Sequence, residues 1–338
     1  MGRYREADLS RLHVGSVADR RTRVSVTDLA RPLDPAAAVA VIDALPRQLG
    51  ADALREAVER TARSHHDGRP VVAMCGGHVV KVGVAPCLIA LLERGVITHL
   101  AMNGAAAIHD VEMARIGRTS EDVEANLHQG TFGMVDETGD FMNRAAVEGA
   151  HRGEGLGECW GRVLEEARVP HRDVSLLAAA WRLGVPATVH VAIGTDTIHH
   201  HPACDGAALG ETSLRDFRIF AATLAEARGA TVLNVGSAVL MPEVFLKALA
   251  VARNLGAELS GLTTVNFDQI QHYRPRVNVV ERPTQAPGSR GLALTGHHEI
   301  MLPLFAAAVL AAVGAATPAG VPAEGRQPGG PRLPRAGA

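Results

Sequence analysis

The sequence is poor in lysine, aromatic residues and cysteine, and it has no long apolar run. Of the 34 basic residues only Lys81 and Lys247 are lysines, and aromatic residues make up 3% of the chain. The four cysteines lack CxxC spacing, which argues against a zinc–thiolate site and favours a reducing compartment. No apolar run is long enough to span a bilayer, and the charged N-terminus "MGRYREADLSRLH" lacks the apolar core of a secretory signal. A cytoplasmic protein without a membrane partner is therefore expected.

The overall composition is that of an ordinary globular protein. Hydrophobic residues account for 47% and charged residues for 21% of the 338 residues, and the net charge of −2 gives no electrostatic reason to expect a nucleic-acid partner. Residues 1–25 are polar and predict a flexible N-terminal segment. Residues 315–338 are rich in Pro, Gly and Ala and predict a disordered tail. The part between them, 26–314, is expected to be a single domain.

Within 26–314, short β-rich runs alternate with helical runs. Strands are expected at 70–76, 96–104, 186–194, 230–237, 261–267 and 276–283. Helices are expected at 86–95, 175–184, 213–229, 242–256 and 299–313. Several of these helical runs end in Gly, a common stop signal. The alternation favours the α/β class, with a doubly wound, mostly parallel Rossmann-like sheet.

Small residues, histidine and aspartate follow nearly every predicted strand. The stretches concerned are 75–78, 103–110, 194–206, 235–238, 267–275 and 295–299. Ligands of such sheets bind at the carboxyl ends of the strands, so one shared site is expected there. Glycine, asparagine and aspartate can also serve turn geometry alone, but turn geometry does not call for histidine.

Four segments resemble deoxyhypusine synthases, and they occur in the order in which that family has them. "HLAMNGAAAIHD" (99–110) resembles the family's strand and small-residue turn, and "HPACDGAALGETSLRDF" (201–217) resembles its Asp-Gly segment. "LNVGSAVLMPEVFLKALAVARN" (233–254) resembles its Gly-rich strand and following helix, and "TTVNFDQ" (263–269) its strand leading to Phe-Asp. The similarity runs from about residue 70 to residue 310.

The resemblance implies a Rossmann-like domain that binds NAD, assembles as a homotetramer and acts on a polyamine or other small amine. In such chemistry NAD removes a hydride from the carbon next to nitrogen and an imine forms. The positions that match the family's NAD contacts are Asn103, Gly104, Asp205, Gly206, Gly236, Ser237 and Asp268. Glu211 stands near the family's acidic polyamine contact, and Glu243 or Pro242 falls where the family has a polyamine-binding histidine.

The family's catalytic lysine has no counterpart in this sequence. It lies in a Trp-Gly-Lys segment, whereas the corresponding stretch "RPRVNVVERPT" (274–284) contains neither lysine nor tryptophan. The resemblance therefore predicts an NAD-dependent transferase or oxidoreductase whose reaction differs from deoxyhypusine synthesis.

The strand ends supply further candidates for chemistry. The candidate catalytic residues are Lys81, His109, His200 and His297. A lysine amine can form an imine or bind an anion, whereas arginine cannot form an imine. Imidazole titrates near neutrality and suits acid–base roles. The carboxylates expected to bind the ammonium groups of an amine are those of Asp196, Glu211 and Glu243.

Two alternatives remain open. The histidines of 199–201, together with those of "HHE" (297–299), could hold zinc or iron in a hydrolase or lyase, although helical ligand spacing is absent. The chain could also be a nucleotide-binding protein without catalytic activity.

Overall fold

A computed structural model describes residues 3–314, so the predicted tail 315–338 lies outside the described residues. In this part of the chain the main sheet has six parallel strands in the order β5-β3-β2-β6-β7-β8. The strands are β2 (Val71–Cys75), β3 (His99–Asn103), β5 (Ala187–His190), β6 (Thr231–Val235), β7 (Thr263–Asp268) and β8 (Arg290–Thr295). The strand order reverses between β2 and β6, the topological switch point of a Rossmann-like fold. The predicted fold class is confirmed.

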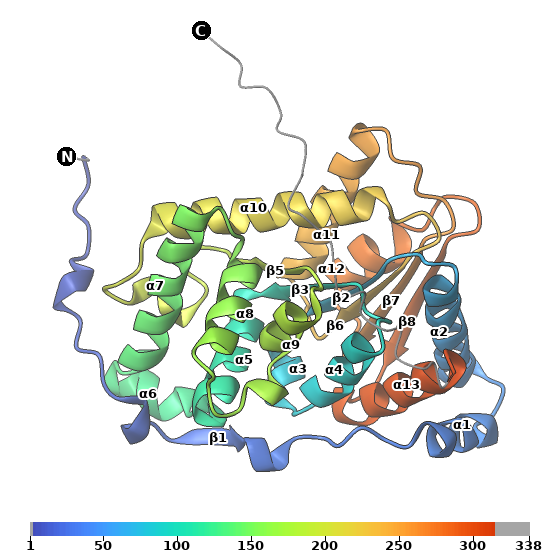
Figure 1. Cartoon of the computed structure of the whole chain (residues 1–338), viewed down its shortest axis with the longest axis horizontal. Helices are drawn as coiled ribbons and strands as arrows, with labels where there is room; N and C mark the ends of the chain where they lie inside the picture. The colour runs from blue at the N-terminus through green and yellow to red at the C-terminus, as the bar shows by residue number, and fades with distance from the viewer. Residues whose placement is uncertain (1–2, 315–338) are drawn as a thin grey trace, which may run out of the picture.

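Helices cover both faces of this sheet (Figure 1). The core on one face is shared by α1 (Pro35–Ala44), α2 (Leu49–His66), α4 (Ala85–Glu93), α5 (Gly104–Ile116), α7 (Asp136–Arg152), α8 (Leu156–Glu166), α9 (Leu176–Leu183) and α13 (His298–Ala312), of which α1 packs on α13 and α7 on α8 and α10. The other face packs against α10 (Gly206–Ala225) and α11 (Leu240–Asn254). Successive side chains of a strand point to opposite faces, and so Val71 and Ala73 join the first core while Val72 and Met74 join the second. Burial on both faces explains why the central strand β2 is apolar throughout.

The N-terminal segment lies along one edge of the molecule and joins a second, small sheet (Figure 1). Strand β1 (Thr22–Ser25) pairs antiparallel with β4 (Arg118–Glu121). Upstream of it are the single turns η1 (Leu9–Arg11) and η2 (Val17–Asp19), and η3 (Val26–Asp28) follows. Glu137 of α7 accepts hydrogen bonds from the Ser16 hydroxyl and the Val17 N–H. Part of the predicted flexible segment 1–25 is thus bonded to the domain.

The prediction of a strand at 276–283 is wrong. Residues Arg276–Glu281 form the π-helix η6, directly after α12 (Tyr273–Pro275), and the sixth strand is β8. The β-branched residues of this run favour a strand, but Pro275 presets a helical φ, and packing of η6 on α11, β7 and β8 overrides the local preference.

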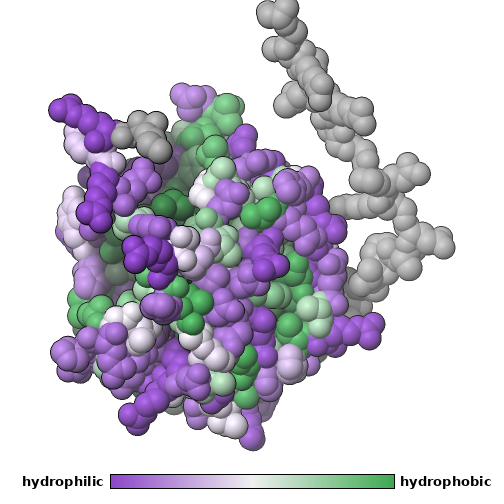
Figure 2. Space-filling model, turned by 90° about the vertical axis from the view of Figure 1, so that its left-hand side faces the viewer, coloured by the Kyte–Doolittle hydropathy of each residue, from purple (hydrophilic) through white to green (hydrophobic). Residues whose placement is uncertain are grey.

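The remaining elements connect the strands and helices already described. They are α3 (Gly77–Lys81), α6 (Val123–Gln129), η4 (Arg172–Val174) and η5 (Thr197–His200). Over residues 3–314, the structure contains no helix with the length and apolarity that crossing a bilayer requires. On the face that carries α7, hydrophilic residues surround small apolar patches (Figure 2).

Candidate functional site

A pocket of about 620 Å³ lies at the carboxyl ends of β3, β5 and β6. Its walls come from the turn after β3, from the loop after β5 and from the first turns of α11. Five of the residues predicted from the sequence line it: Asn103, Asp196, Gly236, Ser237 and Glu243. The pocket therefore brings together residues from three strand ends that lie far apart in the chain.

Beside this pocket, at the switch point, the backbones of two glycines touch. A Cβ atom on Gly76 would lie 2.1 Å from the carbonyl oxygen of Gly236, which no side chain could tolerate. Gly236 also has a φ of +63°, a left-handed conformation that glycine adopts without strain. The two strand ends therefore present bare backbone to the space above them.

Two helices begin at the pocket. The Asn103 side chain accepts a hydrogen bond from Ala106 N–H at the start of α5, over 2.9 Å. The Ser237 hydroxyl accepts one from Met241 N–H at the start of α11, over 3.2 Å. Asn103 is the N-cap of α5, whereas Ser237 lies three residues before α11 and binds an N–H of its first turn. The positive ends of the two helix dipoles lie at the pocket wall.

Asp196 and His199 form a buried pair behind the pocket. The Asp196 carboxylate packs so closely on the start of α5 that a Cβ on Gly104 would lie 2.0 Å from its Oδ2 atom. His199 Nδ1 accepts hydrogen bonds from the N–H groups of Gly194 and Asp196, so the ring proton must be on Nε2. Burial raises the pKa of Asp196 to about 6 and, with the charge of His200, lowers the pKa of His199.

His109 lies on α5, one turn after the pocket-lining Ala105. A Cβ on Gly77 would touch both of these side chains at 3.3 Å, so they share the face of α5 that meets α3. The Nδ1 atom of His109 is 2.8 Å from the hydroxyl of Thr119. Burial, with the charges of Lys81 and Arg20, lowers the pKa of His109 to about 3, and the ring is neutral at pH 7.

A histidine cluster occupies the other side of Gly236. The rings of His78 and His298 meet edge to face with centroids 5.3 Å apart, and the Gln269 amide is 3.1 Å from His78 Nε2. His298 Nε2 donates to the carbonyl of Phe267 over 2.9 Å. Asp268 and Lys81 lie close enough to influence the charge of His78. Lys81 itself is exposed at the end of α3.

Several predicted residues have structural partners instead. His200 Nε2 is 3.1 Å from the carbonyl of Gly133, in the loop before α7. Asp205 caps α10 by accepting N–H bonds from Ala207 and Ala208, with Gly206 beginning that helix. Glu211 pairs with Arg215 over 3.0 Å on the exposed side of α10. His297 precedes α13 and is exposed, 3.4 Å from Glu299.

Glu243 lines the pocket, but its charge is already paired. Its carboxylate binds Lys247 one turn along α11, accepts a hydrogen bond from the Asn278 amide over 2.9 Å, and lies 3.4 Å from Arg274. The Lys247 ammonium lowers the pKa of Glu243. This leaves Asp196 as the unpaired carboxylate of the pocket wall among the described residues.

The predicted metal centre finds no support in the arrangement of side chains. Across residues 3–314, no three His, Cys, Asp or Glu side chains gather as metal ligands would. The histidines of 199–201 diverge toward Asp196, Gly133 and Asp136, while His298 faces Phe267.

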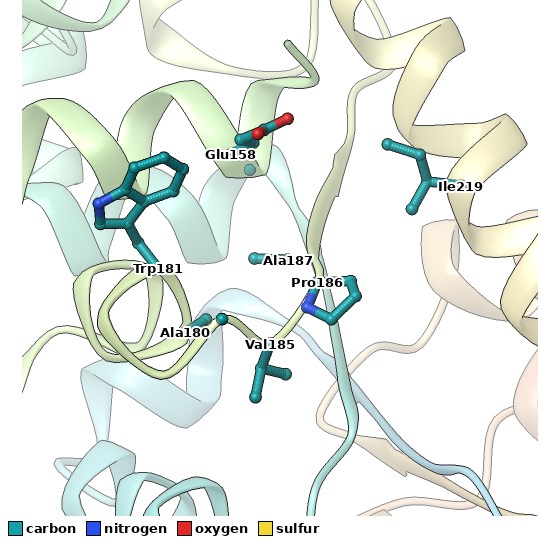
Figure 3. A pocket seen from close by; sticks show the side chains of 9 residues that line it. Glu158, Ala180, Trp181, Val185, Pro186, Ala187 and Ile219 are labelled. Carbon is teal, nitrogen blue, oxygen red and sulfur yellow. The ribbon is translucent and has the colours of Figure 1, made fainter. Parts of the chain in front are cut away.

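A second pocket, of about 460 Å³, lies at the opposite edge of the sheet, where β5 begins. Figure 3 shows Trp181, Val185, Pro186 and Ile219 around it, with the carboxylate of Glu158 nearby. None of the residues predicted from the sequence lines this pocket. The convergence of strand ends, helix starts and an unpaired carboxylate is found at the carboxyl edge.

Of the three consecutive histidines, His200 and not His199 is the catalytic candidate predicted from the sequence. The Asp196-x-x-His199 spacing, which places both residues in one turn, is the sequence signal for the buried pair. No pattern in the sequence links Arg20 to Glu112 of α5, because their ion pair joins two distant segments.

Together the sheet and its helices define a Rossmann-like α/β fold with a pocket at the switch point. No family model and no curated protein matches the sequence. The solved structure of unliganded AgrE has 17% identity and a TM-score of 0.51, over 78% of this chain and 34% of the AgrE chain. AgrE in ternary complex with ornithine and NAD+ has 14% identity and a TM-score of 0.48, over 76% of this chain and 33% of the AgrE chain. This chain thus spans about a third of the AgrE chains.

The resemblance to deoxyhypusine synthases has a structural counterpart with a lower TM-score than unliganded AgrE. A putative deoxyhypusine synthase from Entamoeba histolytica has 9% identity and a TM-score of 0.45, over 78% of this chain and 90% of that one. At such identities a match shows a related fold and carries no argument about family. The comparisons therefore support a related fold and do not show that this chain belongs to the deoxyhypusine synthase family.

Proposed function

We propose that this chain is an enzyme that binds NAD at the switch point and uses it on a small amine. The observation that carries the proposal is the pocket itself. It joins the glycine contact at the switch point, two helix starts and the unpaired carboxylate of Asp196.

The chain's own groups fit a dinucleotide. Gly236 leaves no side chain between the ligand and the backbone, and the starts of α5 and α11 offer positive dipole ends to a pyrophosphate. A volume of about 620 Å³ lies within the usual range for small-molecule sites. Asn103, Gly236 and Ser237 are the residues that would hold the cofactor. When bound, NAD accepts a hydride from the carbon next to nitrogen.

An amine suits the remaining polar group. The Oδ2 atom of Asp196 is enclosed by protein and has no hydrogen-bond partner among the described residues, which is a costly state. A turn of the Asp196 side chain toward the pocket would let it accept an N–H of the ligand. With a pKa of about 6, the carboxyl is ionised at neutral pH, and the start of α5 favours that charged form. AgrE, whose unliganded chain shares this fold, has been solved with ornithine and NAD+.

Deoxyhypusine synthesis itself is not proposed, because the family's lysine segment corresponds here to α12 and η6, which contain no lysine. A homotetramer, implied by the same resemblance, stays a prediction. So does the assignment of 26–314 as one functional domain.

Calorimetric titration with NAD tests the proposal, with a pocket-filling variant and a matched control. Val239 lines the pocket and is 56% exposed, so Val239→Trp should block the site without disturbing the core. Val251 lies on the same helix, is 37% exposed and is not part of the pocket, so Val251→Trp is the control. We expect Val239→Trp to weaken NAD binding at least about tenfold and Val251→Trp to leave it unchanged. Absence of NAD binding by the unaltered protein would reject the proposal.

Turnover is measured separately, by following reduced nicotinamide with ornithine, arginine, putrescine and spermidine as substrates. Mass spectrometry of ligands that remain bound through native purification identifies the amine when none of these four reacts.

A further inference from the structure

Arg20, Glu112, Thr119 and His109 form a row of buried or partly buried side chains. An ion pair joins Arg20 to Glu112, and two hydrogen bonds continue through Thr119 to His109. The guanidinium of Arg20 is 2.8 Å from Glu112 Oε1, and both side chains are buried, at 8% and 3% exposure. The Thr119 hydroxyl donates to Glu112 Oε2 over 2.5 Å. The same hydroxyl oxygen lies 2.8 Å from His109 Nδ1. The row runs from the N-terminal segment through β4 to the face of α5 that meets α3.

The direction of the protons in this row follows from its ends. The Glu112 carboxylate, which pairs with Arg20, can accept hydrogen bonds but cannot donate one. The Thr119 hydroxyl therefore donates its one proton to Glu112. The Thr119 oxygen can then only accept from His109, which requires the ring proton on Nδ1. The Thr138 hydroxyl, 3.2 Å from Glu112 Oε1, donates to the same carboxylate and supports this polarity. His109 Nε2 is left with a bare lone pair.

Within residues 3–314, His109 Nε2 has no hydrogen-bond partner. The atom is also not completely enclosed by protein, so a ligand could reach it. His109 and the pocket-lining Ala105 both face Gly77, beside the glycine contact of the switch point. Lys81, one turn along α3, adds a positive charge that helps to keep the ring neutral. A neutral imidazole with its lone pair available is a hydrogen-bond acceptor, which suits an amine N–H or a hydroxyl group.

We infer that Arg20, Glu112 and Thr119 are positioning residues that hold His109 as a fixed acceptor for an N–H or O–H group of the ligand. The inference rests on the proposed function for the identity of the ligand, but not for the tautomer. His109 and Asp196 then both accept hydrogen bonds, and together they select a ligand with several N–H donors rather than a carboxylate or phosphate at this end of the site.

The plain alternative is that the row only anchors the N-terminal segment to α5. Both readings predict a loss of stability when Glu112 or Arg20 is replaced, because a buried charge would be left unpaired. The test therefore uses Thr119, where Thr119→Val removes the hydroxyl and keeps the shape, while Thr119→Ser restores it.

The decisive measurement is the ¹⁵N spectrum of histidine-labelled, full-length protein, with His109 assigned through a His109→Gln variant. We expect Nδ1–H in the unaltered protein and in Thr119→Ser, and a shift toward Nε2–H in Thr119→Val. The tautomer reports whether the Thr119 hydroxyl keeps the ring proton on Nδ1, and kinetic constants distinguish a positioning role from anchoring alone. Proton on Nε2 in the unaltered protein, or the same tautomer in all three proteins, would overturn the inference.

Kinetics give a second readout. With the amine that reacts, we expect Thr119→Val to lower kcat/KM at least about tenfold and Thr119→Ser to keep it within about threefold. Equal loss in both variants would overturn the role of the hydroxyl in ligand binding. If no amine reacts, the proposed function fails, whereas the tautomer measurement still decides whether the row positions His109.

Discussion

The carboxylate oxygen Oδ2 of Asp196 and the ring nitrogen Nε2 of His199 lie 3.7 Å apart. Neither atom has a hydrogen-bond partner in the part of the chain that the structure describes. Because backbone N–H groups occupy His199 Nδ1, the ring proton is on Nε2. The pair is thus a carboxylate that lies beside a neutral histidine without a hydrogen bond between them.

Asp196→Asn is expected to lower the affinity for the amine substrate at least about tenfold, since an amide cannot balance an ammonium charge. The loss should appear in KM, with NAD affinity changed little. Glu211→Gln is the control, because Glu211 is exposed on α10 and, among residues 3–314, its ion pair is with Arg215. Steady-state kinetics check both variants. Equal kinetics for the two would show that Asp196 does not contact the substrate.

Asp216 predicts a distinctive pH dependence of stability. Its Oδ2 atom accepts the N–H groups of Gly157 and Val189, its Oδ1 atom has no partner among residues 3–314, and burial raises its pKa to about 8 from 3.8. Between these values the unfolded chain has lost the proton that the folded chain keeps. The free energy of unfolding therefore falls as pH rises, by at most about 1.4 kcal/mol per pH unit, and levels off above about 8.

Asp216→Asn cannot titrate and should escape this loss. The stability difference between Asp216→Asn and the unaltered protein is expected to grow in favour of the variant from about pH 4 to about pH 8. Urea unfolding at a series of pH values measures it. Parallel stability curves for the two proteins would contradict the raised pKa.

The glycine contact at the switch point predicts an intolerant position. Gly76→Ala would push a Cβ into the backbone of Gly236, at 2.1 Å, and is expected to cost more than about 3 kcal/mol or to prevent folding. A Cβ on Gly210, inside α10, would meet nothing within 4 Å, so Gly210→Ala should stabilise the helix by about 0.5–1 kcal/mol. Thermal unfolding distinguishes the two, and a Gly76→Ala protein as stable as the parent would be the contrary result.

Lys81 can be tested by charge and by chemistry. An imine-forming lysine needs an amine made neutral by its surroundings, whereas Lys81 is exposed at the end of α3. We therefore expect Lys81→Arg to keep activity within about threefold and Lys81→Ala to lose more, as for a cation that acts on the His109 and His78 rings. Complete inactivity of Lys81→Arg would instead support covalent trapping.

The sequence allowed the sheet and most strand ends to be predicted because buried parallel strands are apolar runs followed by small residues. It failed at 276–283, where Val277 and Val279 suggested a strand but pack as part of a helix. The different surroundings of His199 and His200 could not be predicted from the sequence, because they depend on Asp196 and Gly133 rather than on a local pattern. Capping by Asp205 and the charge pairing of Glu243 were likewise invisible without the packed neighbours.

The ion pair between Arg20 and Glu112 links the N-terminal segment to the charges around His109. Residues before 26 look dispensable by composition, yet one of them neutralises a carboxylate buried in α5. A shortened protein that starts with α1 would keep all six strands of the main sheet and every glycine of the pocket, but it would lose β1 and Arg20. It would therefore place an uncompensated negative charge two hydrogen bonds from His109, so trimming this protein for study removes part of what sets its electrostatics.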